Sequence, residues 1–287
     1  MLKPYGSPGA GAKMVESVVL YCDILGFSAM VEEAARTREG DWLLKRFRAA
    51  SSSAREYFLE ATQAEHELAP CAIQVFSDNT LVGWPVATPD GREELTSAIM
   101  LAAFYQLTLA EEGFFSRGCI STGLLYIDDD VVLGPALLEA YRIEREKARD
   151  PRVVLSPRAV SMAQGHIAGA EQGDAFYGSW LLRDVDGQSF VSYLMPRVLL
   201  RKSSKTFLTH KAVVEQNLLR FQDDPYIWSK YAWTAGYHNY MCSTYLPRRR
   251  KERIGRAGRA RGPEPFPGAK RVAQPLHDIE YSTPRAR

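Results

Sequence analysis

Two aspartates lie in hydrophobic surroundings where an ionised carboxylate needs a compensating partner. Asp23 directly follows the apolar run SVVLYC, and Asp78 lies inside CAIQVFSDNTLVGWPV, between two apolar stretches. A divalent cation is one such partner for a carboxylate at the end of a buried strand. If the two side chains face each other across adjacent strands, they can hold two Mn²⁺ or Mg²⁺ ions. The alternative for either residue alone is an ordinary turn or helix-capping aspartate.

The elements around these aspartates follow from hydrophobic periodicity and from turn residues. We expect strands at 17–21, 71–76, 79–86, 115–127, 131–133, 152–155 and 190–194. We expect helices from 27, at 41–65, 93–109 and 136–149, and after Ser156-Pro157. In this order a β-hairpin with Asp78 at its tip is enclosed by helical segments. The pattern predicts an α+β fold, with a ferredoxin-like βααββαβ sheet flanked by helices.

The chain divides into four parts by composition. Residues 1–15 are rich in Gly and Pro and are expected to be flexible, and 16–197 form the main domain. Two helices at 207–220 and 226–243 form a C-terminal helical extension, placed at 198–246. Residues 247–287 carry twelve Lys/Arg against four Asp/Glu, or +8, which leaves 24 against 30, or −6, for the rest. This basic tail is expected to be disordered.

Several classes of protein are disfavoured by composition. The 287 residues are 46% hydrophobic and 24% charged, as in ordinary globular proteins. No apolar stretch reaches the roughly 18 residues of a spanning helix, so we expect no membrane partner. The four cysteines form no CxxC pair, and the five histidines show no ligand spacing. We therefore expect a cytoplasmic protein without zinc or disulfides.

Four segments together resemble the class III nucleotidyl cyclases. The family motifs are a D-[IV]-x-G-F strand-to-helix turn, a G-D hairpin, an R-x-G-I-x-x-G strand and a G-x-x-V-N-x-A-x-R helix. The matching segments here are 23–27, 77–78, 117–123 and 134–142. The resemblance spans 18–194 and implies a class III cyclase-like fold for the main domain.

The resemblance also implies an activity, which is the formation of a 3′,5′-cyclic nucleotide from a nucleoside triphosphate with release of pyrophosphate. It makes Asp23, Asp78 and the carbonyl of Ile24 the ligands of two divalent cations, Mn²⁺ or Mg²⁺. The amides of Gly26, Phe27 and Ser28 would bind the triphosphate at the start of a helix. Arg142 matches the arginine that stabilises the transition state from the partner subunit, so a homodimer with active sites at its interface is implied.

The departures from the family concern the base and the catalytic asparagine. Gln74 stands where adenylyl cyclases have Lys and guanylyl cyclases have Glu, and Val131 stands at the second base-reading position. Leu138 replaces the catalytic Asn, and Ser77 replaces the hairpin Gly. The triphosphate lysine has no clean equivalent, and Arg183 is the candidate to replace it. A site that lacks groups complementary to a purine discriminates poorly in its favour, so a purine substrate is disfavoured.

One branch with this profile is the pyrimidine cyclases of the Pycsar antiphage systems. The likeness includes GPALLEAYRIE at 134–144 and an aromatic segment at 230–239. It implies that the product is cyclic UMP or cyclic CMP, with UTP the favoured substrate. It also implies that the product activates a separate effector protein during phage infection.

Three other functions stay open on the sequence alone. The chain can be a purine (adenylate or guanylate) cyclase, or a catalytically weak homologue that binds nucleotide, as Leu138 suggests. The third is a nucleic-acid-binding module that uses the basic tail and the aromatics at 226–237. It ranks last because the rest of the chain is acidic, so no stable nucleic-acid partner is expected.

Overall fold

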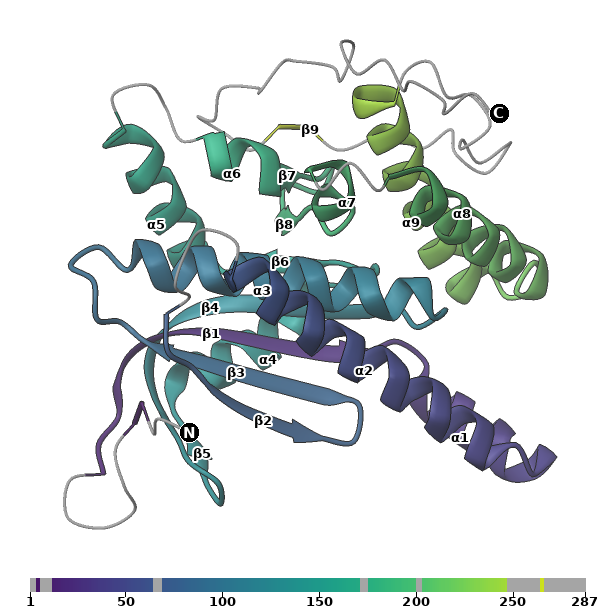
Figure 1. The fold of residues 1–287 in the computed structure, drawn as a ribbon, viewed down its shortest axis with the longest axis horizontal. Helices are drawn as coiled ribbons and strands as arrows, with labels where there is room; N and C mark the ends of the chain where they lie inside the picture. The colour runs from purple at the N-terminus through teal and green to yellow at the C-terminus, as the bar shows by residue number, and fades with distance from the viewer. Residues whose placement is uncertain are drawn as a thin grey trace, which may run out of the picture.

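A single mixed sheet forms the centre of the protein (Figure 1). The computed structural model describes residues 4–5, 12–63, 69–170, 175–199, 203–246 and 264–265. The strands are β1 (Val15–Ile24), β2 (Ala72–Phe76), β3 (Asn79–Pro85), β4 (Ser116–Ile127), β5 (Val132–Leu133), β6 (Val153–Leu155), β7 (Leu181–Arg183), β8 (Ser189–Val191) and β9 (Glu264–Pro265). Their order in the sheet is β2-β3-β1-β4-β6-β8-β7-β9, and β5 pairs with β4.

The helices cover both faces of this sheet. They are α1 (Phe27–Thr37), α2 (Gly40–Gln63), α3 (Arg92–Glu111), α4 (Pro135–Lys147), α5 (Pro157–Ala168), α6 (Ala175–Trp180), α7 (Met195–Leu199), α8 (Ser203–Arg220) and α9 (Pro225–Tyr245). Figure 1 shows α2 and α3 on one side of the sheet and α4 on the other. The predicted α+β fold with its βααββαβ order is therefore confirmed.

Strand β1 is central because it pairs antiparallel with both β3 and β4. Its side chains alternate between the two faces, as in any strand. Leu20 and Cys22 belong to the main core, whereas Val19 lies in a smaller cluster with Ala136 of α4. Asp23 follows the same alternation as Val19, so its side chain lies on the α4 face.

The β1–β4 pairing brings two backbones unusually close. Cys22 is opposite Gly118, and a Cβ atom on Gly118 would lie 2.2 Å from the carbonyl oxygen of Tyr21. Only glycine fits there, which explains one glycine of the 117–123 segment. The close approach fixes the register that places Arg117 opposite Asp23.

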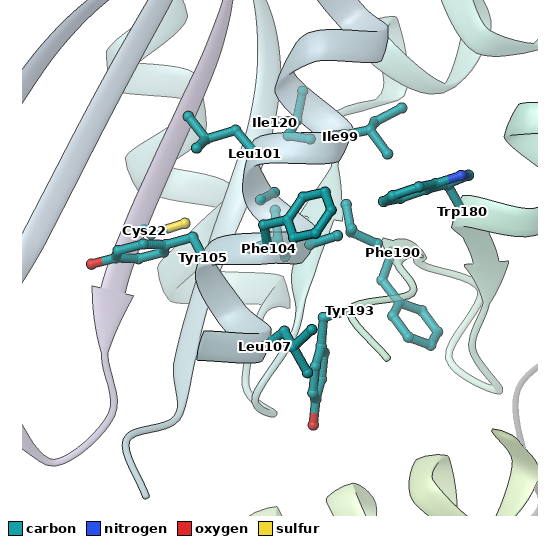
Figure 2. Close-up of a cluster of buried hydrophobic side chains, with 14 of the residues drawn as sticks. Cys22, Ile99, Leu101, Phe104, Tyr105, Leu107, Ile120, Trp180, Phe190 and Tyr193 are labelled. Carbon is teal, nitrogen blue, oxygen red and sulfur yellow. The ribbon is translucent and has the colours of Figure 1, made fainter. Parts of the chain in front are cut away.

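Helix α3 links the sheet to the C-terminal half of the main domain. Nearly every side chain from Leu95 to Ala110 is buried. Figure 2 shows Phe104 and Ile99 of α3 near Trp180 and Phe190, while Tyr105 lies toward Cys22. The 93–109 helix was thus placed correctly from sequence, but its burial extends all round rather than along one face.

Helices α8 and α9 occupy the range of the predicted extension and share the core of the main domain. The Tyr237 hydroxyl accepts from the backbone N–H of Leu194 at 2.9 Å and lies 3.1 Å from Ser192 Oγ. His238 is fully buried. Trp233 and Tyr237 act as packing residues, because both rings contact Phe190.

The structure differs from the sequence prediction at short elements. Helices α6 and α7 and strands β7 and β9 were not predicted, and β8 ends at Val191 rather than at Leu194. Tyr5, within the segment expected to be flexible, is 4% exposed and donates to Ser17 Oγ. Apart from β9, the predicted disordered tail lies outside the described residues. Within the described part of the chain, no helix is long and apolar enough to cross a membrane.

Candidate functional site

Asp23 lies at the end of β1, where the strand passes into α1. Its side chain is 19% exposed, so it borders the core without being sealed in it. The chain then turns through Gly26, which has a left-handed φ of 72° and forms the N-cap of α1. Nothing lies within 4 Å of the Cβ that Gly26 lacks, so the requirement for glycine here is conformational. The turn carries the chain from the end of β1 into α1 shortly after Asp23.

Asp78 lies in the two-residue turn of the β2–β3 hairpin, closed by the Phe76–Asn79 pair. Ser77 has a φ of 56°, a conformation that glycine adopts more readily than serine. Asn79 donates from Nδ2 to Asp78 Oδ1 at 3.4 Å, and its Oδ1 accepts a short hydrogen bond from the Tyr21 hydroxyl. The hairpin tip is therefore tied back to β1 beside Asp23.

The two aspartates interact with each other. Burial raises the pKa of Asp23, the Arg117 guanidinium opposes this, and both a hydrogen bond with Asp78 and its negative charge raise the pKa further. Two carboxylates within hydrogen-bonding contact repel each other when both are ionised. The strand end and the hairpin tip thus form one acidic site, assembled from positions 55 residues apart (78 − 23).

Arg117 and Glu144 complete this site, and sequence reasoning assigned neither of them a role. Arg117 Nε and Nη2 each lie 3.2 Å from Asp23 Oδ2, and Nε lies 2.6 Å from Glu144 Oε1. Glu144 comes from α4 and is 2% exposed. Burial raises its pKa, Arg117 lowers it, and the charge of Asp23 raises it. When ionised, Asp23, Asp78 and Glu144 outnumber the single guanidinium by two charges.

This arrangement fits divalent cations. The two aspartates converge on one place with an excess of negative charge, and carboxylate oxygens are the ligands that Mg²⁺ and Mn²⁺ prefer. The carbonyl of Ile24 is adjacent to Asp23 in the chain. Among the described residues no group of three or more His, Cys, Asp and Glu side chains is arranged to hold a metal. A site here would therefore depend on two carboxylates, with the remaining ligands from backbone, nucleotide or water.

The amides predicted to bind triphosphate follow Asp23 in the chain, at 26–28. Phe27 and Ser28 form the first turn of α1, and no side chain caps this helix. The first N–H groups of a helix have no partner within the helix and attract anions. Gly26 and Ser28 are exposed and Phe27 is half-buried, packed on Phe47. A phosphate group could approach these amides from solvent.

Arg142 is not part of the acidic site of its own chain. It is exposed on α4, two residues before the buried Glu144. The same helix also exposes Leu138, which is 70% exposed, and Tyr141, which is 44% exposed. Tyr141 packs edge-on against Tyr21 of β1. Helix α4 thus presents one side to the acidic site and Arg142 to the outside.

The two predicted base-reading positions meet at the turn between β4 and β5. Gln74 donates from Nε2 to the carbonyl oxygens of Asp128 and Asp129, at 2.6 and 2.9 Å. Val131 follows in the same turn, with its amide bound to Asp128 Oδ1 and its side chain 49% exposed. The structure therefore brings Gln74 and Val131 into one region.

Arg183 lies apart from the other predicted residues. It is exposed on β7, which is separated from β1 along the sheet by β4, β6 and β8. Four strand spacings of about 4.8 Å amount to roughly 19 Å, beyond the reach of one arginine side chain. Within one chain, the structure does not bring Arg183 together with Asp23 and Asp78.

Comparison with known proteins gives a limited result. No protein-family model and no curated protein sequence matches the chain. Among solved structures, the chain is similar to a class III adenylyl cyclase-like ATP-binding protein from Pseudomonas aeruginosa, with 14% sequence identity and a TM-score of 0.37. The similarity covers 56% of this chain, and the chain spans only 37% of that protein's chain.

Proposed function

We propose that this protein is a metal-dependent nucleotide cyclase that converts a pyrimidine nucleoside triphosphate, with UTP favoured, into its 3′,5′-cyclic monophosphate and pyrophosphate. The observation that carries the proposal is the contact between Asp23 and Asp78, together with the uncapped start of α1 that follows Asp23 in the chain. A divalent-cation site and an anion site would thus lie next to each other. A nucleoside triphosphate with bound metal needs both.

Each group of the chain has a distinct role in the proposed reaction. Asp23, Asp78 and the Ile24 carbonyl would hold two Mn²⁺ or Mg²⁺ ions, and the amides of 26–28 would bind phosphate oxygens. Bound cations would lower the pKa of the ribose 3′-hydroxyl and neutralise the triphosphate. The 3′ oxygen then forms a bond to the α-phosphorus, its proton leaves to water, and the bond to pyrophosphate breaks.

A second copy of the chain would supply Arg142. Apolar side chains are exposed on α4 and in the segment just before it, and they support an interface there. They are Val131, Leu133, Leu138 and Tyr141, between 44% and 70% exposed. In the proposed homodimer, Arg142 of one protomer would neutralise the charge that develops on the phosphate in the site of its partner.

The pyrimidine preference rests on the sequence resemblance, because Gln74 stands where the purine cyclases have the Lys or Glu that reads their base. Its Nε2 atom already donates to two backbone carbonyls. This leaves Oε1 as the atom that would accept from a base, and both uracil and cytosine carry an N–H donor on the pairing edge. The choice of UTP, and a role as the messenger-forming enzyme of a Pycsar-type antiphage system with a separate effector, rest on the sequence resemblance.

The decisive experiment incubates the purified chain with each of the four nucleoside triphosphates and Mn²⁺, followed by mass analysis of the products. We expect cyclic UMP to be the main product, with cyclic CMP next. Cyclic AMP or cyclic GMP as the main product would make the protein a purine cyclase. No cyclic product from any of the four, with metal binding demonstrated, would refute the proposed activity.

Leu138 favours one alternative function, a homologue that binds nucleotide with little or no turnover. It stands at the position of the catalytic asparagine, and its hydrocarbon side chain offers no hydrogen bond. Binding of a non-hydrolysable UTP analogue, without cyclic product from UTP, would support this alternative. Leu138→Asn would then be expected to raise turnover.

A further inference from the structure

The guanidinium of Arg117 is shared between two carboxylates that differ in their access to water. Its Nε atom lies 3.2 Å from Asp23 Oδ2 and 2.6 Å from Glu144 Oε1. This nitrogen carries only one hydrogen, so it cannot give its best hydrogen bond to both carboxylates at once. A small rotation of the guanidinium decides which of the two carboxylates accepts that hydrogen bond.

The two partners of Arg117 are not equivalent. Glu144 is 2% exposed, so water cannot replace Arg117 as its partner. Asp23 is 19% exposed and already faces Asp78, so a cation that arrives from solvent can take the place of Arg117 there. An arginine left without an anion at this half-buried position would oppose that exchange. Glu144 supplies the anion.

We propose that Glu144 is a positioning residue of the metal site, which holds Arg117 away from Asp23 when divalent cations bind and so sets their affinity. In the absence of metal, Arg117 serves as the counter-ion of Asp23. Metal binding transfers Arg117 wholly to Glu144. The inference rests on the proposed function, because it concerns the same Asp23–Asp78 site.

Helix α4 gives this arrangement a further consequence. Glu144 reaches Asp23 through Arg117, and Tyr141 of the same helix packs on Tyr21, which binds Asn79 next to Asp78. Both aspartates are therefore connected to α4 by separate chains of contacts. Since α4 also carries Arg142, a shift of this helix on dimerisation would change the metal site of its own protomer.

The test measures Mn²⁺ affinity without nucleotide, from the electron paramagnetic resonance signal of free Mn²⁺. Glu144→Gln keeps the shape of the side chain but leaves Arg117 with Asp23 alone. We expect its Mn²⁺ affinity to fall at least about tenfold, the usual effect of losing a group that orients a metal ligand. The control is Glu146→Gln, which removes an exposed charge from the same helix and should change affinity less than about twofold.

A double-mutant comparison separates positioning from a structural effect. In an Arg117→Gln background no guanidinium competes for Asp23, so Glu144→Gln should weaken Mn²⁺ binding by less than about twofold. An equal loss in both backgrounds, or an affinity of Glu144→Gln close to that of the wild type, would overturn the proposal. The second criterion applies even if Arg117→Gln does not fold.

The outcome also distinguishes this inference from the proposed function. Mn²⁺ binding that depends on Asp78 and Glu144, without cyclic product, would remove the function and leave the inference. Cyclic product from the wild type, together with unchanged Mn²⁺ affinity in Glu144→Gln, would support the function and overturn the inference. A wild-type chain that binds no Mn²⁺ at Asp78 would overturn both.

Discussion

Two clusters in this protein each combine one arginine with three carboxylates, yet they differ in how the carboxylates are satisfied. Arg117 lies with Asp23, Glu144 and, through Asp23, Asp78. The other arginine, Arg152, directly precedes β6, the strand next to β4, and pairs with three aspartates. They are Asp150, Asp184 and Asp186.

The Arg152 cluster is closed. Arg152 is 1% exposed, its guanidinium lies over the rings of Phe190 and Trp233, and Asp184 also accepts from Trp233 Nε1 at 2.6 Å. Asp186 accepts from Arg152 and from the amide of Gln188. These contacts join β6, the β7–β8 turn and α9. The cluster therefore acts as a structural clamp that attaches the C-terminal helix to the sheet.

The Arg117 cluster is open. Arg117 is 23% exposed, and in the part of the chain that the structure describes Asp78 has only a long 3.4 Å contact with Asn79 besides its contact with Asp23. Among the described residues, no aromatic ring lies over the Arg117 guanidinium. The comparison teaches that the same charge composition serves stability where the arginine is buried among rings and aspartates, and serves binding where two carboxylates face each other within reach of solvent.

The largest expected effect follows from removing a carboxylate of the open cluster. Asp78→Ala should lower cyclase turnover by about a thousandfold, the scale on which loss of a preorganised electrostatic group acts. The fold should keep its stability or gain slightly, because a repulsion with Asp23 disappears. Initial rates of product formation and urea unfolding measure the two effects.

A matched control for this substitution is Asp223→Ala, which changes an exposed aspartate between α8 and α9. Its turnover should stay within about twofold of the wild type, as for most surface substitutions. Full activity of Asp78→Ala would show that the acidic pair is not the active site. A large loss of stability would instead place Asp78 among the structural residues.

The closed cluster should respond in the opposite way. Arg152→Met removes the arginine that pairs with three aspartates and should lower the free energy of unfolding by about 3–5 kcal/mol. Arg149→Met, at an exposed position three residues earlier, should change it by less than about 0.5 kcal/mol. Equal effects of the two substitutions in urea unfolding would contradict the clamp.

The sequence predicted the aspartates of the open cluster but not its arginine, for a physical reason. Asp23 and Asp78 are visible because each interrupts an apolar run, which is a local signal. The pairing of Arg117 with Asp23 spans 94 positions and depends on the β1–β4 register, which no local pattern encodes. Glu144 lies inside a helix with other charges, and only its 2% exposure distinguishes it.

The fold shows the same division. Long elements were predicted, such as β1, α3 and α9, because their apolar content extends over many residues. Helix α7 has five residues and α6 has six, less than two helical turns, so periodicity has too little length to identify them. The closed cluster was not predicted either, because Arg152 opens the strand-like run RVVL and gives no sign that it is buried.

The smallest effect concerns Asp150, the third aspartate of the closed cluster. Burial raises its pKa to about 6, Arg152 opposes this, and the charges of Asp184 and Asp186 add to the rise. A carboxyl group whose pKa is higher in the folded state than in the unfolded state stabilises the fold below its unfolded pKa of 3.8. That stabilisation is lost as the pH rises through about 6. At neutral pH, ionised Asp150 therefore costs the folded state free energy.

Asp150→Asn removes this cost and should stabilise the protein by about 2 kcal/mol at pH 8. Its advantage over the wild type should shrink as the pH falls through about 6 and vanish near pH 4. Urea unfolding of both proteins across this range measures the difference, in which the titration of all other groups cancels. Asp223→Asn makes the same chemical change at an exposed site and should show no such dependence. A difference that stayed constant, or grew toward acid pH, would mean that Arg152 fully compensates the charge of Asp150.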